Sequence, residues 1–286
     1  MLKSRSEKVF NVCNILLMCL LSLVFILPYW MIVVSSLTEE LTLIRQGYSI
    51  WPTAFSFEAY RYIFATNQLM LRSIFNSLFV ALAGSFLTLV VSSLYAYPLS
   101  RKWIKGKKFF TLYSSMTMIF GGGLIPTFMV VTFFFDDSLL ALFVPQAMVA
   151  WYAILLRNYY LTIPDSFEEA ALLDGASQYS IFFKIYTPLA MPINASCILF
   201  TAVSLWNNYT SPMLYITTKE KFTVQYLVQQ IITSLDSIYG GASSGITPSQ
   251  SVKMASIVVA SLPIIIIYPF LQKYFINSTI VGGVKE

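Results

Sequence analysis

The chain has 286 residues, and none of them is histidine. Without histidine it cannot form a His-ligated zinc site or a Ser-His-Asp catalytic triad. Charged residues are also scarce, at 11% of the chain, whereas about a quarter of the residues of a soluble domain are charged. Hydrophobic residues make up 57%. This composition excludes an ordinary soluble domain and indicates a protein that lies in lipid.

Charge is absent from six long stretches of the sequence. Each stretch reaches the roughly 18–20 residues that a helix needs to cross the hydrocarbon core. Only helices and closed barrels satisfy their backbone hydrogen bonds in lipid, and stretches this long and uniformly apolar form helices. The sequence therefore predicts an all-α membrane protein with six transmembrane helices. The stretches are 9–38, 73–100, 109–135, 138–156, 185–218 and 254–272.

The same absence of charge argues against one class of transporter. A carrier driven by protons or ions usually places an ionisable side chain in the membrane, because a residue has to carry the coupled charge. No Asp, Glu, Lys or Arg lies inside the six stretches. We therefore do not expect a proton-coupled carrier.

Neither the cysteines nor the glycines predict a cofactor site. All three cysteines lie in predicted spans, where we interpret them as buried apolar residues and not as a disulfide or metal framework. They are Cys13, Cys19 and Cys197. Gly240 and Gly245 have P-loop spacing, but Ile246 stands where the phosphate-binding Lys is needed. We therefore expect no catalytic residue, no metal and no cofactor on this chain.

The basic residues predict the orientation, because cytoplasmic loops carry an excess of Lys and Arg. Placing the N-terminus and the loop 101–108 inside puts twelve of the 18 basic residues on the cytoplasmic side. Both termini are then cytoplasmic. The first stretch lacks a small-residue cleavage site, so we expect it to remain as an anchor. The excess of basic over acidic residues reflects this topology, and no nucleic-acid partner is expected.

The longest polar insertion on the predicted inner side is the segment 161–188, between the fourth and fifth spans. Pro164 and Asp165 end the preceding helix, and Ser166 with Glu169 has the spacing of a capping box. A short helix follows, and Gly175 suits a helix end or a sharp turn. Taken alone, these residues predict an ordinary capped surface hairpin in which Glu169 is only a cap.

The same segment carries a longer pattern. The tripeptide Glu169-Ala170-Ala171 is followed after three residues by Gly175, after nine more by Ile185, and after two more by Pro188. This pattern resembles the cytoplasmic coupling loop of bacterial ABC importer permeases, although Thr187 stands where the family usually has Leu. The resemblance implies a helix-turn-helix whose first helix sits in a groove of a separate ATPase. The residues implied to couple to that ATPase are Glu168, Glu169, Ala170, Ala171, Asp174, Gly175 and Pro188.

Further stretches resemble the carbohydrate branch of these permeases, specifically the second permease of maltose-type importers. They are Trp206-Asn207-Asn208-Tyr209 and the residues 251–255, 262–263 and 268–275. The glycine-rich residues 120–126 and the ending 282–286 are similar to a subgroup that imports complex oligosaccharides. The resemblance covers nearly the whole chain.

The resemblance implies the type I ABC importer permease architecture, with residues 1–286 forming a single transmembrane permease domain. The implied function is that of a transmembrane subunit, itself not an enzyme, in an ATP-driven importer that moves an oligosaccharide into the cell by alternating access. The implied partners are a second, homologous permease subunit, two ATPase subunits that bind ATP and Mg, and an extracellular solute-binding lipoprotein. The implied location is a bacterial cell membrane.

Several residues are candidates for a substrate path. The three glycines of residues 121–123, followed by Pro126, either break the third span beside a cavity or allow close helix contact. Trp206 either stacks on a sugar, while Asn207 and Asn208 form hydrogen bonds with the hydroxyls of that sugar, or it belongs to an interfacial aromatic belt. The candidates are Gly122, Trp206, Asn207, Asn208 and Tyr209. Residues 222–235 have apolar residues at helical spacing, which predicts an amphipathic helix lying across the pore mouth. Such a helix either meets a substrate-binding protein or caps the bundle.

Two alternatives stay open at this point. An ABC permease for another solute, such as an amino acid or a polyamine, shares the coupling loop and differs only in the tail. An integral membrane enzyme acting on lipid-linked sugars needs catalytic groups at the membrane face, and Asp136-Asp137 is the only adjacent aspartate pair. A tight turn between the third and fourth spans also explains this pair.

Overall fold

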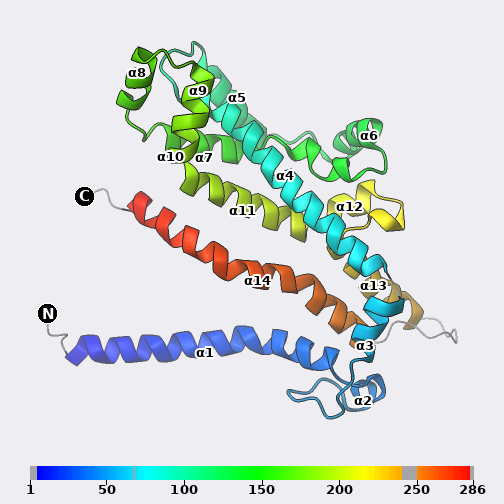
Figure 1. Ribbon diagram of the computed structural model, residues 1–286. Helices are drawn as coiled ribbons and strands as arrows, with labels where there is room; N and C mark the ends of the chain where they lie inside the picture. Colours follow the sequence, from blue (N-terminus) through cyan, green and yellow to red (C-terminus); the bar gives the residue numbers. More distant parts are fainter. Residues whose placement is uncertain (1–4, 67, 240–249, 284–286) are drawn as a thin grey trace. The chain divides into compact units, whose positions relative to one another are not determined.

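The computed structural model describes residues 5–66, 68–239 and 250–283. These residues form helices joined by short connections (Figure 1), and their only strand-like pairing is an isolated bridge between Thr38 and Phe55. The predicted all-α class is therefore confirmed. Along the chain the elements are α1 Arg5–Ser36, α2 Glu40–Gln46, α3 Glu58–Arg61, η1 Tyr62–Thr66, α4 Leu69–Ser100, α5 Lys107–Ile119, α6 Leu124–Phe135, η2 Leu139–Leu142, η3 Val144–Gln146, α7 Ala150–Tyr160, α8 Ser166–Leu173, α9 Gln178–Ile181, η4 Phe182–Tyr186, α10 Thr187–Leu189, α11 Met191–Asn207, α12 Thr210–Tyr215, η5 Lys219–Lys221, α13 Val224–Tyr239 and α14 Gln250–Gly283.

Three helices are long and apolar enough to cross a membrane by themselves. They are Val9–Ser36 of α1, Leu69–Ser100 of α4 and Gln250–Pro269 of α14. Three further spans are bent, each made of two helical segments that meet at a short break. They are Lys107–Ile119 with Leu124–Phe135, Leu139–Gln146 with Ala150–Tyr160, and Gln178–Leu189 with Met191–Asn207. If each bent pair is one span, the described residues contain the six spans that the sequence predicts.

The third span is broken at its glycines, as one of the two interpretations predicted. The axes of α5 and α6 differ by 108°. Gly123 has a φ of +85°, in the left-handed region that side chains other than glycine rarely adopt. A Cβ added at Gly121 would meet no atom within 4 Å. Within this chain the glycines therefore break the helix and do not serve close helix contact.

The fifth span bends by 79° between α10 and α11. Pro188 has no amide to donate, and the chain passes through the π-helical turn η4 just before it. Thr187 bonds the carbonyl of Phe182 twice, through its amide and through its hydroxyl, the latter at 2.9 Å. The threonine at this position, where the resemblance leads one to expect Leu, therefore exchanges apolar contact for a hydrogen bond beside the bend.

The described chain divides into two compact units. Unit 1 comprises Met1–Met70 and Val228–Leu262, and unit 2 comprises Leu71–Leu227 and Pro263–Glu286. The single domain expected over residues 1–286 stays a prediction.

In unit 1, α14 is held at its start and along its length by side chains of the first 70 residues. Glu40 accepts the amides of Gln250 and Ser251 at 2.9 and 3.0 Å, so its carboxylate satisfies the first turn of α14. Tyr29 of α1 shares a hydrogen bond of 2.8 Å with Ser261 of α14. Most of α1 is nevertheless exposed. The prediction of buried cysteines is therefore wrong for Cys13 and Cys19, which are exposed on α1.

Unit 2 holds two apolar clusters, and α4 contributes to both. The first cluster is formed by Ala96, Tyr97, Leu156, Tyr160, Ile163, Ile181, Phe182, Tyr186, Ala190 and Cys197. The second is formed by Val80, Leu142, Phe143, Leu205 and Ile216. The first cluster lies beneath the predicted coupling hairpin, because it includes residues on both sides of α8. Cys197 is buried in it, as predicted.

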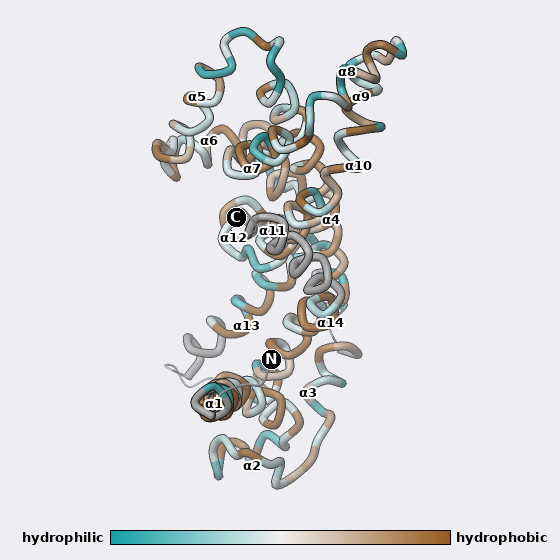
Figure 2. Tube along the Cα trace, turned by 90° about the vertical axis from the view of Figure 1, so that its left-hand side faces the viewer, coloured by the Kyte–Doolittle hydropathy of each residue, from teal (hydrophilic) through white to brown (hydrophobic). Residues whose placement is uncertain are grey.

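The predicted amphipathic helix is also present. α13 covers the predicted residues from Val224 onward, and Val224, Leu227 and Val228 are buried. Gln229 and Gln230 are exposed. Figure 2 shows hydrophobic residues along the spans and polar residues gathered in the segment before α5 and around α8. The many exposed apolar side chains on the spans suit a chain surrounded by lipid.

Gly84 lies at a close approach of α4 to its neighbours. A Cβ added there would lie 2.4 Å from Leu205 Cδ1 and 2.8 Å from Phe143 Cβ, and overpacking of this kind costs about 1–3 kcal/mol. We therefore expect Gly84→Ala to lower the temperature at which the detergent-solubilised chain aggregates, measured by size-exclusion chromatography after heating. Gly121→Ala, where an added Cβ meets no atom within 4 Å, is the matched control. Equal heat resistance of the two variants would contradict this close approach.

Candidate functional site

The predicted hairpin forms two short helices, α8 and α9. The capping box predicted from Ser166 and Glu169 is wrong. Asp165 is the N-cap, and the Glu169 amide donates to the backbone carbonyl of Asp165 at 3.0 Å. Ser166 lies one residue too late to cap, because it is already inside the helix. The acidic first turn, Glu168 and Glu169, still suits the positive end of the helix dipole.

Gly175 ends α8 in the left-handed conformation, with a φ of +78°. The helix end predicted from a glycine at this position is therefore present. Its amide donates to the carbonyl of Leu172 at 3.0 Å, and the Ala176 amide donates to that of Ala171 at 2.9 Å. These two bonds form a Schellman motif, which satisfies carbonyls at the helix end. A side chain at position 175 would strain this turn.

Most of α8 is exposed. The exposed fraction of Leu173 reaches 90%. Four of the predicted coupling residues are exposed together on α8 and its turn, namely Glu169, Ala170, Asp174 and Gly175. Ala171 is half-buried and packs against the first apolar cluster, whereas Pro188 lies in α10 at the bend of the fifth span. The exposed end of the hairpin is therefore a small surface with short side chains, two acidic groups and the large apolar side chain of Leu173.

Glu168 points the other way and is 8% exposed. Its carboxylate accepts from Arg101 Nη1 at 3.1 Å, from Trp103 Nε1 at 3.2 Å and from Gln178 Nε2 at 3.3 Å. A carboxylate out of water is stable only when it is paired and hydrogen-bonded, and these three donors meet that need. Glu168 therefore anchors α8, while its neighbour Glu169 is presented at the surface.

Sequence reasoning missed the role of Arg101, which it counted only as a cytoplasmic charge. Arg101 and Glu168 lie 67 positions apart, and no local spacing relates them. The only available signal was that Arg101 directly follows a charge-free span.

A second ion pair beside the first lies in solvent. Lys102 Nζ lies 2.6 Å from Asp165 Oδ2, and the lysine side chain is 84% exposed. Their mutual hydrogen bond lowers the pKa of Asp165 and raises the pKa of Lys102. Exposed pairs add little stability, because solvent and salt screen them. The anchoring of α8 therefore depends on the buried pair.

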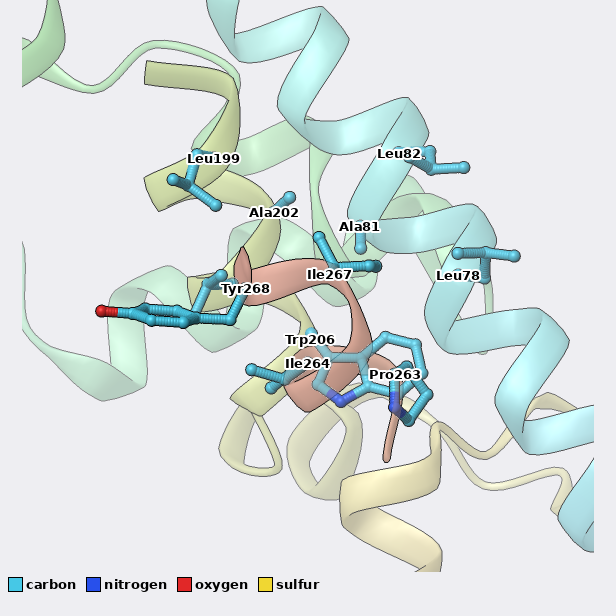
Figure 3. Close-up of a pocket in the computed structure, with 11 residues that line it drawn as sticks. Leu78, Ala81, Leu82, Leu199, Ala202, Trp206, Pro263, Ile264, Ile267 and Tyr268 are labelled. Carbon is cyan, nitrogen blue, oxygen red and sulfur yellow. The ribbon is translucent and has the colours of Figure 1, made fainter. Parts of the chain in front are cut away.

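Trp206 lies in an apolar pocket of unit 2 and is 4% exposed. The pocket has a volume of about 100 Å³, and side chains from α4, α11 and α14 line it (Figure 3). Figure 3 shows Leu78 and Leu82 of α4 together with Pro263 and Ile267 of α14 around this space. Such surroundings are largely apolar and bury the indole, so they favour a packing role for Trp206.

The three residues after Trp206 have two different roles. Asn208 holds the first turn of α12, since its Oδ1 accepts the Ser211 amide at 3.0 Å and its Nδ2 donates to Ser211 Oγ at 2.9 Å. Asn207 and Tyr209 are exposed, and Asn207 Oδ1 accepts from Gln225 Nε2 at 3.5 Å. Asn207 and Tyr209 are therefore the residues of this group that can meet a ligand.

In unit 2, α6, which directly follows the glycine break, packs against α12. Phe128 of α6 stacks on Tyr215 of α12, with ring centroids 5.9 Å apart. Gly122 is exposed in the break that precedes α6. Gly122 precedes α6, and Asn207, Asn208 and Tyr209 directly precede α12. The contact between α6 and α12 therefore brings the two predicted groups of path residues to one region of this unit.

Asp137, proposed above as a possible catalytic group, is fully engaged in a turn. Its carboxylate accepts the hydroxyl and amide of Thr218 at 2.5 and 3.1 Å, the amide of Thr217 at 2.9 Å and Lys221 Nζ at 2.9 Å. The Thr218 hydroxyl and Lys221 hold the pKa of Asp137 far below its usual range. An ionised carboxylate with four donors is a poor general acid or base, so the turn accounts for this residue.

Comparison with known proteins gives one consistent result. Residues 1–281 match the family described as "Binding-protein-dependent transport system inner membrane component". In Bacillus subtilis (strain 168), the polygalacturonan/rhamnogalacturonan transport system permease protein YtcP is 38% identical over 269 residues, covering 92% of this chain and 94% of the relative. The arabinooligosaccharides transport system permease protein AraQ of the same organism is 30% identical over 282 residues, covering 97% and 96%.

A solved structure is similar over nearly its whole length. It is a chain of the "crystal structure of a bacterial ABC transporter involved in the import of the acidic polysaccharide alginate". The TM-score is 0.85 and the sequence identity 31%, with coverage of 96% of this chain and 99% of that chain. The similarity in sequence and in fold therefore extends across all the helices described above.

Asp137→Asn should loosen the turn at residues 217–221, because a neutral amide cannot hold Lys221 and the threonine donors as a carboxylate does. The pKa of Asp137 is depressed in the folded state, so its charge stabilises the fold fully above the unfolded pKa of about 4 and ceases to do so as the pH falls through the folded pKa. At pH 7 we expect the amides of Thr217 and Thr218 to exchange faster in the variant than in the wild type. This difference in exchange rate should shrink below about pH 4. Hydrogen–deuterium exchange measures this, with exposed Asp136→Asn as the control. Unchanged protection in Asp137→Asn at pH 7 would contradict this account of the turn.

Proposed function

Because this chain belongs to the family of binding-protein-dependent transport system inner membrane components, we propose that it is the transmembrane subunit of an ATP-driven ABC importer that moves an oligosaccharide into the cell. The observation that carries this proposal is the exposed end of α8. A short helix with an exposed acidic residue, small side chains and a left-handed glycine turn projects from the chain while its buried carboxylate anchors it. Such a helix suits docking into a groove on another protein.

The names of the relatives support a carbohydrate substrate. YtcP is named for polygalacturonan and rhamnogalacturonan transport, AraQ for arabinooligosaccharides, and the matched crystal structure for alginate import. All three are polymeric sugars or their fragments. We therefore assign an oligosaccharide to this chain in preference to an amino acid or a polyamine, which the coupling loop alone would equally allow.

The chain's own part in transport is mechanical. Its partners would be a second, homologous permease subunit, two ATPase subunits that bind ATP and Mg, and an extracellular solute-binding lipoprotein. Closure of the ATPases on ATP would draw α8 along, and the spans would rock between inward-facing and outward-facing states. The chain would lie in a bacterial cell membrane with both termini on the cytoplasmic side, as the positive-inside rule predicts.

Within this mechanism the predicted path residues take different roles. Gly122, Asn207 and Tyr209 are exposed and would line the path, since broken helices and polar side chains offer hydrogen-bonding groups to sugar hydroxyls. Trp206 and Asn208 would hold the adjoining helices in place, because their surroundings in unit 2 already occupy them.

The docking of the ATPase tests this proposal. We expect Glu169→Lys and Gly175→Asp each to abolish co-purification of the ATPase from mild detergent while membrane insertion stays normal. The first reverses an exposed charge, and the second strains a turn whose φ is +78°. Wild-type chain should recover the ATPase, a second six-span permease and a sugar-binding lipoprotein, identified by mass spectrometry.

Two control variants match these changes outside the hairpin. Glu58→Lys makes the same charge change at an exposed site of α3, and Gly47→Asp strains a glycine with a φ of +73° and no atom within 4 Å of an added Cβ. Both should retain the ATPase. Recovery of the wild-type chain alone across several detergents, or normal docking of both hairpin variants, would overturn the proposed function.

A further inference from the structure

Arg101 is a buried charged residue whose guanidinium donates hydrogen bonds from all three of its nitrogens. It directly follows α4, and its exposed fraction is only 2%. Its Nε donates to Ser100 Oγ at 2.9 Å, its Nη1 to Glu168 Oε2 at 3.1 Å, and its Nη2 to the carbonyl of Tyr160 at 2.9 Å. Nη1 also donates to the hydroxyl of Tyr186.

The surroundings of the guanidinium are aromatic as well as polar. Its central carbon lies 4.4 Å from the ring centroid of Tyr186 and 5.6 Å from that of Tyr97. Arginine suits this place because its planar fork can bond several acceptors and lie against rings at the same time, which a lysine ammonium cannot do. One side chain therefore joins the ends of α4 and α7 to α8 and η4.

The attachment of α8 to the rest of unit 2 is otherwise slight. Glu168 is the only buried residue of this eight-residue helix, and its partner is Arg101. Ala171 adds a small apolar contact. Asp165, the N-cap of α8, pairs with exposed Lys102 at 2.6 Å and lies 3.8 Å from Arg101 Nη1. If the buried pair were absent, α8 would be connected to the spans mainly through its two flanking turns.

We propose that Arg101 is the positioning residue that makes α8 and α4 move as one rigid body, so that displacement of α8 by the ATPase is passed to the transmembrane helices. This inference rests on the proposed function. The chemistry favours it, because separating the two buried opposite charges leaves the Glu168 carboxylate without a positively charged partner in a low-dielectric site. A load on α8 therefore displaces α4 before it breaks the pair.

The test must separate transmission from folding. Arg101→Met alone leaves the Glu168 carboxylate buried without its charge partner, which is strongly destabilising. The informative variant therefore replaces both, Arg101→Met with Glu168→Met, because exchanging a buried ion pair for apolar side chains of similar size often preserves folding. Lys102→Ala is the matched control, since it removes an adjacent positive charge from an exposed ion pair.

The readout is the distance between α8 and α4. Spin labels are placed at Leu173→Cys and Leu94→Cys, which are 90% and 42% exposed, in a chain whose three native cysteines are replaced. Pulsed electron paramagnetic resonance then gives the distance distribution in the purified complex, with and without ATP and vanadate. In the wild type and in Lys102→Ala we expect one narrow distribution that trapping leaves unchanged. In the double Met variant we expect a broader distribution that shifts on trapping, with a loss of ATPase stimulation by the binding protein.

A narrow, unshifted distribution in a well-folded double Met variant would overturn the proposal, because apolar contact would then suffice to hold α8. An equal broadening in Lys102→Ala would overturn it too. If instead the proposed function is wrong, the wild-type chain would purify without any ATPase, and this result distinguishes the two failures. In that case the nucleotide-free distributions still decide whether Arg101 holds α8 to α4.

Discussion

Arg101 is removed from water at the end of α4, and a guanidinium in that position needs a compensating carboxylate. Glu168 supplies it and is the only buried residue of α8. With Glu168 turned inward, helical geometry turns Glu169, Ala170 and Leu173 outward. The need to pair one buried charge thus determines both where α8 is attached and which of its faces is exposed.

The membrane imposes the second constraint, because backbone groups in lipid must find partners within the protein. Three of the six spans nevertheless break, at residues 120–123, 147–149 and 190. Glycine permits the first break and proline the third, where the Thr187 hydroxyl bonds a neighbouring carbonyl. Half-helices that end inside a span expose backbone and polar side chains to a path, which a bundle of six straight helices would not.

Much of this was predictable from the sequence, because long charge-free stretches and turn residues act locally. The six spans, the glycine break, the amphipathic α13 and the Gly175 turn all follow from local composition and conformational preference. The capping box failed because the helix begins one residue earlier than Ser166 suggests. The Arg101–Glu168 pair and the apolar pocket of Trp206 could not be predicted, since both depend on residues brought together only by folding. Cys13 and Cys19 were expected to be buried because they are apolar, but in lipid an apolar residue has no need of burial within the chain.

Photo-crosslinking from α8 tests most directly whether an ATPase engages this surface. A photoreactive benzoyl-phenylalanine is introduced in place of Leu173, the most exposed large apolar residue of α8, and in a second chain in place of Val130, an exposed residue of α6. After irradiation of intact membranes, mass spectrometry identifies the protein joined to each position. The account predicts an ATPase adduct at position 173 and none at position 130. Absence of an ATPase adduct at position 173, or equal adducts at both positions, would contradict it.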